Sequence, residues 1–139
     1  MAASQVSQVI LVDTDVFSYM RRNRPEATPY LQHLSKTIPA LSFSTVAELY
    51  QWAFKSNWSP ANVSKLKSDL RKFLILPYDE TVAEQWASIQ TAIPGRRFPV
   101  NDAWTAACAL AYGCPILTHN RKDFQDVPGL FMISYAPEL

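Results

Sequence analysis

The chain has 139 residues, 48% of them hydrophobic and 18% charged, with a net charge of +1 at pH 7. This length predicts a single domain over residues 1–139 with a substantial core. The composition excludes a disordered tail, and the balanced charge excludes a domain that binds nucleic acid by bulk charge alone. No apolar run approaches the roughly 18 residues that cross a bilayer. Residues 1–7 lack the features of a secretory signal, so we expect a cytoplasmic protein without a membrane partner.

Apolar runs alternate with helix signals along the whole chain. In chain order we predict a strand at 8–12, a helix from Val16, a helical segment at 29–35, a strand at 40–44, a helix at 48–55, a helix from 60 to about 72, a strand at 73–76, a helix at 80–92, a helix at 102–112, and strands at 115–118 and 130–134.

Capping signals set several of these boundaries. Thr45 and Glu48 have the spacing of a capping box. Ser59, Asp79 and Asn101 are expected N-caps, and Gly113 is expected to end the helix before it. The two cysteines are too few for a disulfide framework and are expected to be buried thiols.

The alternation predicts an α/β fold with three layers, α/β/α, around a central, mostly parallel sheet of four to five strands. In such sheets, functional sites form beyond the carboxyl ends of the strands. Four acids occupy comparable positions near these ends. Asp13 ends the first strand, Glu48 lies near the start of the helix after the second, Asp102 opens the alanine-rich helix, and Asp123 follows the fourth strand.

Each acid alone is explained by helix capping or by a solvated turn. Together at one edge of a sheet, however, four carboxylates would repel one another unless a cation offset their charge. All-oxygen ligands favour Mg²⁺, with Mn²⁺ as an alternative, and such ions serve phosphoryl chemistry. We therefore expect a metal site formed by these acids.

Four motifs carry a resemblance to a known family. They are Val-Asp-Thr-Asp-Val at 12–16, Thr-Val-Ala-Glu-Leu at 45–49, Asn-Asp-x-x-x-Ala-Ala-x-Ala-Leu-Ala at 101–111 and Thr-x-Asn-x-x-Asp-Phe at 118–124. In this order and spacing, the sequence resembles PIN-domain ribonucleases, and most closely the VapC-type toxins of bacterial toxin–antitoxin pairs. The resemblance spans nearly the whole chain, from about residue 9 to residue 135.

The resemblance implies a PIN-like fold and metal-dependent endonucleolytic cleavage of RNA. Asp13, Glu48, Asp102 and Asp123 would be the catalytic quartet that binds one or two Mg²⁺ ions. The implied partners are the RNA substrate, a small antitoxin protein that covers the site, and a second copy of the chain in a homodimer. Asp15 departs from the family's usual Asn and adds a negative charge beside Asp13.

Other residues have supporting roles in this interpretation. Thr14, Asp15, Thr118 and Asn120 are placed to hold or tune the carboxylates, although turn chemistry explains them equally well. The candidate RNA-binding residues, which could equally be ordinary solvated surface, are Arg21, Arg22, Arg96, Arg97 and Lys122. His119 is expected to be a surface residue. Of the aromatic residues at 52, 54, 58, 86 and 104, most are expected to be core, and a minority would form a groove for a partner helix.

Two other functions stay open from the sequence alone. Residues 10–15 also resemble the Asp-x-Asp signature of haloacid-dehalogenase-like phosphatases, with Asp13 as nucleophile and Asp15 as general acid. The chain is short for that family and lacks a convincing late acidic motif. The third hypothesis is a non-catalytic interaction module whose acids are all caps, which would show no rise in melting temperature with Mg²⁺.

Overall fold

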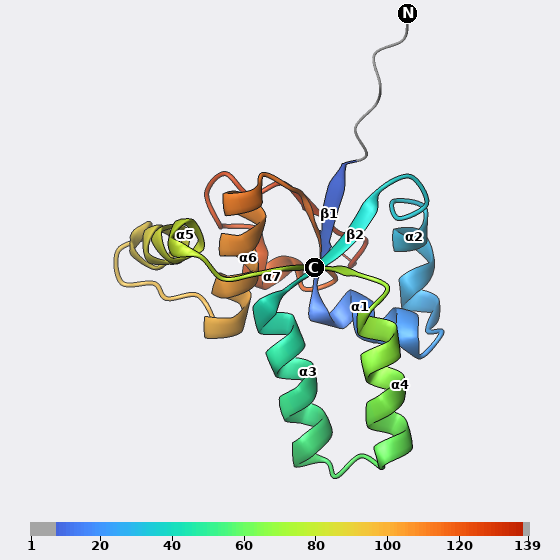
Figure 1. Ribbon diagram of the computed structural model, residues 1–139. Coiled ribbons are helices and arrows are strands. Elements are labelled where there is room, and N and C mark those ends of the chain that lie inside the picture. The colour runs from blue at the N-terminus through green and yellow to red at the C-terminus, as the bar shows by residue number, and fades with distance from the viewer. Residues whose placement is uncertain (1–7, 138–139) are drawn as a thin grey trace, which may run out of the picture.

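Figure 1 shows the computed structural model, which describes residues 8–137. Five strands form one sheet in the order β3-β2-β1-β4-β5, and every neighbouring pair is parallel. The strands are β1 (Val9–Val12), β2 (Ile38–Ser42), β3 (Leu74–Leu76), β4 (Ile116–Leu117) and β5 (Met132–Ile133). The helices of the described residues are α1 (Thr14–Arg21), α2 (Thr28–Leu31), α3 (Phe43–Lys55), α4 (Pro60–Leu70), α5 (Glu80–Thr91), α6 (Val100–Tyr112) and α7 (Arg121–Phe124), with a short 3-10 turn, η1 (Pro25–Ala27), before α2.

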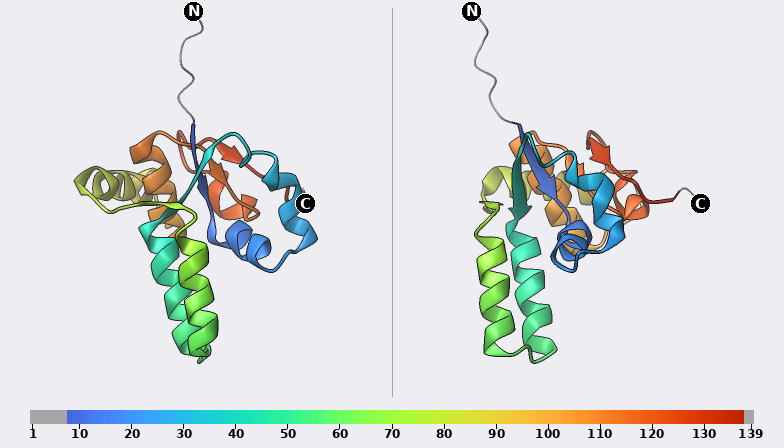
Figure 2. Two further views of the ribbon diagram at one scale, coloured as in Figure 1. Left: turned by 45° about the vertical axis from the view of Figure 1, so that its right-hand side comes forward. Right: turned by 90° about the vertical axis from the view of Figure 1, so that its right-hand side faces the viewer.

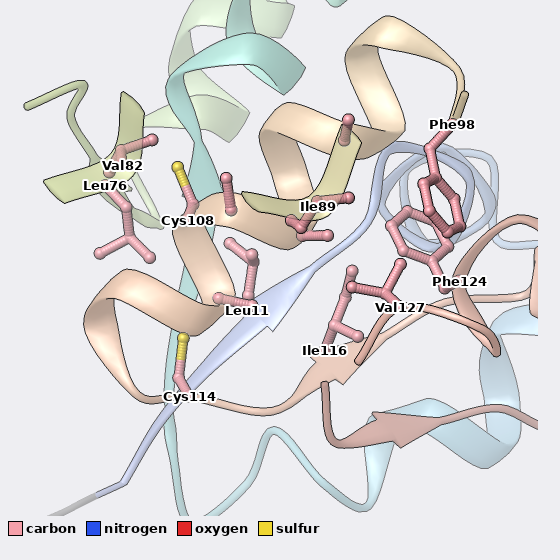
Figure 3. Close-up of a cluster of buried hydrophobic side chains, with 14 of the residues drawn as sticks. Leu11, Leu76, Val82, Ile89, Phe98, Cys108, Cys114, Ile116, Phe124 and Val127 are labelled. Atoms are coloured by element: carbon pink, nitrogen blue, oxygen red, sulfur yellow. The ribbon is translucent and has the colours of Figure 1, made fainter. Parts of the chain in front are cut away.

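The sheet is covered on both faces because its strands bury side chains alternately on each side. On β1, Leu11 joins a cluster with α5 and α6, whereas Ile10 and Val12 join a second cluster with α1, α3 and α4. Figure 3 shows the first cluster, with Leu11 below Cys108 of α6 and Ile89 of α5, and Ile116 beside Val127. The predicted three-layer α/β/α architecture with a parallel sheet is thus confirmed.

The strand order places a topological switch at β1. From β1 the chain builds outward through β2 and β3, and it then returns to the other side of β1 for β4 and β5. In open parallel sheets, such a switch opens a crevice beyond the carboxyl ends of the strands. Residues that follow β1 and β4 directly therefore lie at the position where a site is expected.

Helices α3 and α4 extend away from the sheet as a pair. Both views of Figure 2 show them side by side, beyond the carboxyl ends of β1 and β2. Leu49 and Ala53 of α3 and Leu66 and Leu70 of α4 are buried in the same cluster, which holds the two helices together.

Several helix boundaries differ from the sequence prediction. Helix α1 begins at Thr14 rather than Val16, with Asp13 as its N-cap. The predicted capping box of Thr45 and Glu48 is wrong, because Ser42 is the N-cap of α3 and accepts a hydrogen bond from the Thr45 N–H at 3.1 Å.

The predicted cap at Asn101 is also wrong, since α6 already begins at Val100 after Pro99. The short helix α7 was not predicted.

Other local predictions are confirmed. The side chains of Ser59 and Asp79 cap α4 and α5. Gly113 ends α6 in the left-handed region, with φ of 66°. Both cysteines are buried free thiols, and burial raises the pKa of Cys108 to about 12 and that of Cys114 to about 11. Within residues 8–137, no helix has the length and apolarity to cross a membrane.

Candidate active site

Asp13 lies at the end of the central strand and is only 5% exposed. Its Oδ1 accepts a hydrogen bond from the Thr14 N–H at 2.8 Å, and its Oδ2 accepts one from the Thr118 hydroxyl at 2.7 Å. Burial, together with the nearby charge of Asp15, raises the pKa of Asp13 well above its ordinary value. The two donors oppose this rise and fix the carboxylate in place.

Asp15 ties α1 to the loop that follows β4. Its Oδ1 accepts a hydrogen bond from the Val16 N–H at 2.7 Å, and its Oδ2 accepts one from the His119 N–H at 3.1 Å. Burial raises the pKa of Asp15, while these backbone donors lower it. Both oxygens serve to join two backbone segments, an arrangement that suits a structural role better than that of a mobile general acid.

The pKa of Asp102 shows the effect of the neighbouring carboxylates most clearly. It lies half-buried in the first turn of α6, and its pKa is raised to about 7 by burial and then by the charges of Asp123, Glu48 and Asp15. Asp102 and its acidic neighbours come from α1, α3, α6 and α7, which the sequence separates widely. The expected convergence of carboxylates at this edge of the sheet is therefore present in the structure.

Two amide side chains hold the outer members of this group. The Asn120 Nδ2 donates to Asp123 Oδ2 at 2.7 Å, and the Asn101 Nδ2 donates to Glu48 Oε2 at 2.9 Å. Because an ionised carboxylate offers about four acceptor positions, a single amide donor leaves most of them free. Neighbouring amides therefore orient Glu48 and Asp123 without saturating them.

The acids open into a cleft of about 440 Å³ at the switch point, which we call the acidic cleft. It is lined by residues 13–15, Ser18, Tyr19, Arg22, Glu48, Trp52, Asp102 and Asn120. The side-chain atoms of these acids that could bind a cation are oxygens, which hard divalent cations prefer as ligands. Burial and then the charges of Asp123, Glu48 and Asp15 raise the pKa of Asp102, and a cation would relieve the repulsion between these carboxylates. In the arrangement that the structure describes for residues 8–137, no three His, Cys, Asp or Glu side chains are placed to hold one metal ion together.

A buried set of hydroxyl groups lies beneath the acids, and sequence reasoning missed most of it. The Thr14 hydroxyl donates to Thr45 Oγ1 at 3.0 Å, while the hydroxyl oxygens of Ser42 and Ser44 are 2.6 Å apart. Thr105 of α6 lies 3.3 Å from both serine hydroxyls. These contacts join α1, the start of α3 and α6, the helices that carry Asp15, Glu48 and Asp102. The only sequence signal was the run of serine and threonine after the second strand.

The predicted RNA-binding residues are not all brought to the cleft. Arg22 lines it, with its guanidinium 5.1 Å from the centre of the Trp52 ring. Arg21 instead forms an ion pair with Asp69 of α4 at 2.8 Å.

The other three lie outside the acidic cleft as well. Arg96 pairs with Asp126 at 2.6 Å. Arg97 is exposed in the loop before α6, and Lys122 lines a neighbouring cleft. Of the five, only Arg22 is therefore placed to contact a phosphate beside the acids.

Comparison with known proteins agrees with this architecture. The PIN-domain family profile matches residues 10–130. The chain is 31% identical over 98 residues to ribonuclease VapC4 of Mycobacterium tuberculosis, covering 68% of this chain and 75% of the relative. It is 26% identical over 128 residues to ribonuclease VapC1 of Haemophilus influenzae, covering 88% of this chain and 94% of the relative.

A solved structure shows the same fold. The structure of VapBC-1 from nontypeable Haemophilus influenzae superposes with a TM-score of 0.80 and 27% identity, over 91% of this chain and 98% of that chain. The chain therefore belongs to the PIN-domain family and, within it, to the VapC-type ribonucleases. These similarities do not favour the phosphatase alternative.

Proposed function

We propose that the protein is an endoribonuclease that depends on Mg²⁺, and that it is the toxin of a VapBC-type toxin–antitoxin pair. The observation that carries this proposal is the group of Asp13, Glu48, Asp102 and Asp123 in or beside one cleft of a PIN fold. The raised pKa of Asp102, which burial and the neighbouring carboxylates cause, supports a cation site in this cleft. The relatives named above are ribonucleases, which agrees with RNA as the substrate.

Asp13, Asp102 and Asp123 would hold the cation, with Glu48 binding it or orienting the attacking water. A divalent cation at such a set of oxygens supplies activation of water and neutralisation of charge on the leaving oxygen; Mn²⁺ would also suit these ligands. The chain's own contribution is orientation. Thr118 and the Thr14 N–H fix Asp13, and Asn120 fixes Asp123.

Arg22 is the cation best placed to bind RNA beside these acids. The stacking of its guanidinium on Trp52 orients it at the edge of the acidic cleft. A phosphate next to the scissile bond would contact Arg22, while the acids act on the scissile phosphate itself. Arg22 thus offsets the repulsion between RNA and the carboxylates.

We infer that the antitoxin covers the side of α3 that carries Trp52. This ring is 41% exposed, which is unusual for a large apolar side chain. The rings of Trp52 and Trp58 lie 6.0 Å apart and extend this apolar surface beside Arg22. An amphipathic segment of the antitoxin bound here would bury the aromatic residues and reach the acidic cleft.

The remaining partner and location predictions are part of the same proposal. A toxin that cuts cellular RNA acts in the cytoplasm, and that is where we place this protein. The homodimer stays a prediction from the resemblance, to be tested by the mass of the purified protein in solution.

The test is cleavage of purified total RNA with Mg²⁺ and with EDTA, using wild-type protein, Asp102→Asn and Asp126→Asn. Asp126 is an exposed acid that follows Asp123 in the same segment and forms an ion pair with Arg96. It serves as the matched control. We expect discrete fragments from wild type and Asp126→Asn, which disappear with EDTA and with Asp102→Asn. Fragments that persist in both of those conditions would contradict the proposed site.

A further inference from the structure

We propose that a second cleft, next to the acidic cleft, binds one unpaired nucleotide of the RNA substrate beside the phosphate that is cut. The second cleft is lined by residues 119–122, Gln125 and residues 136–137, and it has a volume of about 540 Å³. This proposal rests on the proposed function, and it names where the substrate is recognised rather than where it is cut.

The two clefts are neighbours that share one lining residue. Asn120 lines both of them, and its side-chain amide holds Asp123. An RNA strand whose phosphate lies at the acids would therefore place an adjacent nucleotide over Asn120 and into the second cleft. The volume is within the range of pockets that enclose small ligands, roughly 300–1,000 Å³, and a nucleotide is a ligand of this kind.

The imidazole of His119 is held at the wall of this cleft in one orientation. Its Nδ1 is 2.8 Å from the hydroxyl oxygen of Tyr30, and the rings of Tyr19 and Tyr30 contact it edge-on at centroid distances of 5.6 and 5.9 Å. Its own backbone N–H is bound to Asp15. A ring fixed in this way binds a ligand with little loss of conformational entropy.

The contact with Tyr30 occupies one ring nitrogen of His119. The Tyr30 hydroxyl accepts from the Tyr135 N–H at 2.9 Å, and its oxygen lies 3.1 Å from the carbonyl oxygen of Thr118 and 2.8 Å from Nδ1 of His119. Nδ1 therefore has its partner within the protein, so Nε2 is the ring nitrogen left to bind a polar group of a base, while the ring can stack on that base.

The charges around the second cleft favour a nucleic acid. Within residues 8–137, Arg121 and Lys122 form no ion pair with an acid. The guanidinium of Arg121 is held in place by donating to the carbonyl oxygens of Ser134 and Ala136 at 3.1 and 3.3 Å. Two cations beside a cluster of carboxylates provide the attraction that RNA needs at this site.

The charged and polar side chains that line the cleft favour a nucleotide over a protein helix as its occupant. A helix of a partner protein would need an apolar groove, and the large exposed aromatic residues Trp52 and Phe54 lie on α3 instead. The second cleft offers an imidazole, two cations and the amide of Gln125, groups that suit a base and its phosphate.

The first arm of the test measures RNA binding in EDTA, where no cutting interferes. Labelled single-stranded RNA is titrated with wild type, His119→Ala, Lys122→Ala, Gln125→Ala and the control Lys55→Ala. Lys55 is an exposed cation near the end of α3 that lines neither cleft. We expect His119→Ala to weaken binding by about tenfold, as loss of a stacked base does, and Lys55→Ala to leave it unchanged. Gln125 and Lys122 are exposed, so their variants test the cleft even if His119→Ala unfolds.

The second arm measures specificity with oligonucleotides that differ only at one position beside the cut. In wild type, the relative cleavage rates should depend on that base. In His119→Ala and Gln125→Ala, this dependence should be reduced several-fold, whereas a merely structural defect would slow all substrates equally. Unchanged base preference together with unchanged affinity in all three variants would overturn the proposal.

The third arm is photo-crosslinking of RNA that contains 4-thiouridine, with the crosslinked peptides identified by mass spectrometry. We expect crosslinks within residues 119–125. The first and third arms need no cleavage, so they test the second cleft even if the wild-type protein fails to cut RNA. Failure to cut RNA would refute the proposed function but not the binding of a nucleotide in this cleft. Crosslinks confined to other segments, or variants that lose binding of an antitoxin but not of RNA, would overturn the proposal.

Discussion

Replacing Asp102 by Asn should make the protein more stable at neutral pH while it abolishes cleavage. In the folded protein, burial and the charges of Asp123 and Glu48 raise the pKa of Asp102 from its ordinary value of 3.8 to about 7. The folded state therefore holds this proton more tightly than the unfolded state does. Its free energy of unfolding falls as the pH rises from about 4 to about 7, and the loss is complete above pH 7. Asn is neutral and avoids this loss.

The size of the effect follows from the two pKa values. The difference between 3.8 and about 7 corresponds to a ceiling of about 4 kcal/mol, since each pH unit is worth about 1.4 kcal/mol. Asp102 is only half-buried, so solvent screens part of the repulsion. We expect a gain of about 1–2 kcal/mol, which for a protein of this size raises the midpoint of urea unfolding by roughly 0.5–1 M.

The assay is urea unfolding in EDTA at pH 8 and at pH 4 for wild type, Asp102→Asn and the control Asp126→Asn. The gain for Asp102→Asn should appear at pH 8 and largely disappear at pH 4, because at pH 4 the unfolded wild type still carries about half of the proton and most of the loss has not yet set in. Asp126→Asn, which removes a carboxylate paired with Arg96, should not be stabilised. A variant at position 102 that is no more stable than wild type at pH 8, or that is equally stabilised at both pH values, would refute the reasoning. Added Mg²⁺ should stabilise wild type far more than Asp102→Asn.

Three further expectations concern single contacts. Arg22→Ala should lower the rate of RNA cleavage several-fold with little change in stability. Arg21→Ala should lose the ion pair with Asp69, which costs up to about 1 kcal/mol in urea unfolding, and should leave cleavage nearly unchanged. The reverse pattern would contradict the placement of the two arginines. Thr118→Val should lower stability by about 2–3 kcal/mol, measured by urea unfolding, because it removes the hydroxyl that donates to buried Asp13, and a neutral outcome would show that this bond contributes little. Gly113→Ala should cost about 1 kcal/mol in the same assay, because φ is 66° there and no atom lies close enough to add a clash; an unchanged midpoint would show that the end of α6 adjusts freely.

The architecture could be predicted because its signals are local. The buried strands of a parallel sheet are short apolar runs, and residues 9–12 and 74–76 appear in the sequence as such runs. Helix starts were less reliable, because serine and threonine compete for the N-cap position. Ser42 caps α3 only because β2 ends there, and the end of a strand is decided by its pairing with its neighbours.

The acids of the site could be predicted for a related reason. Asp13 directly follows a strand, and Asp102 opens a helix that begins at the same edge of the sheet, so the topology alone brings them together. The partners of the arginines could not be predicted in this way. Asp69, which binds Arg21, lies on α4, and only the packing of α4 against α1 brings the two within 2.8 Å.

The donors that hold the acids explain how the fold tolerates the cluster. Asp13 and Asp15 together accept four hydrogen bonds, three from backbone N–H groups and one from the Thr118 hydroxyl. Two of these donors, the Thr118 hydroxyl and the His119 N–H, come from the segment that directly follows β4. The pairing of β1 with β4 therefore supplies the groups that stabilise the charges at the end of β1. Asp102 accepts no such hydrogen bond among residues 8–137, and burial together with the charges of Asp123 and Glu48 raises its pKa, so a cation beside Asp102 would offset a repulsion that the fold itself leaves in place.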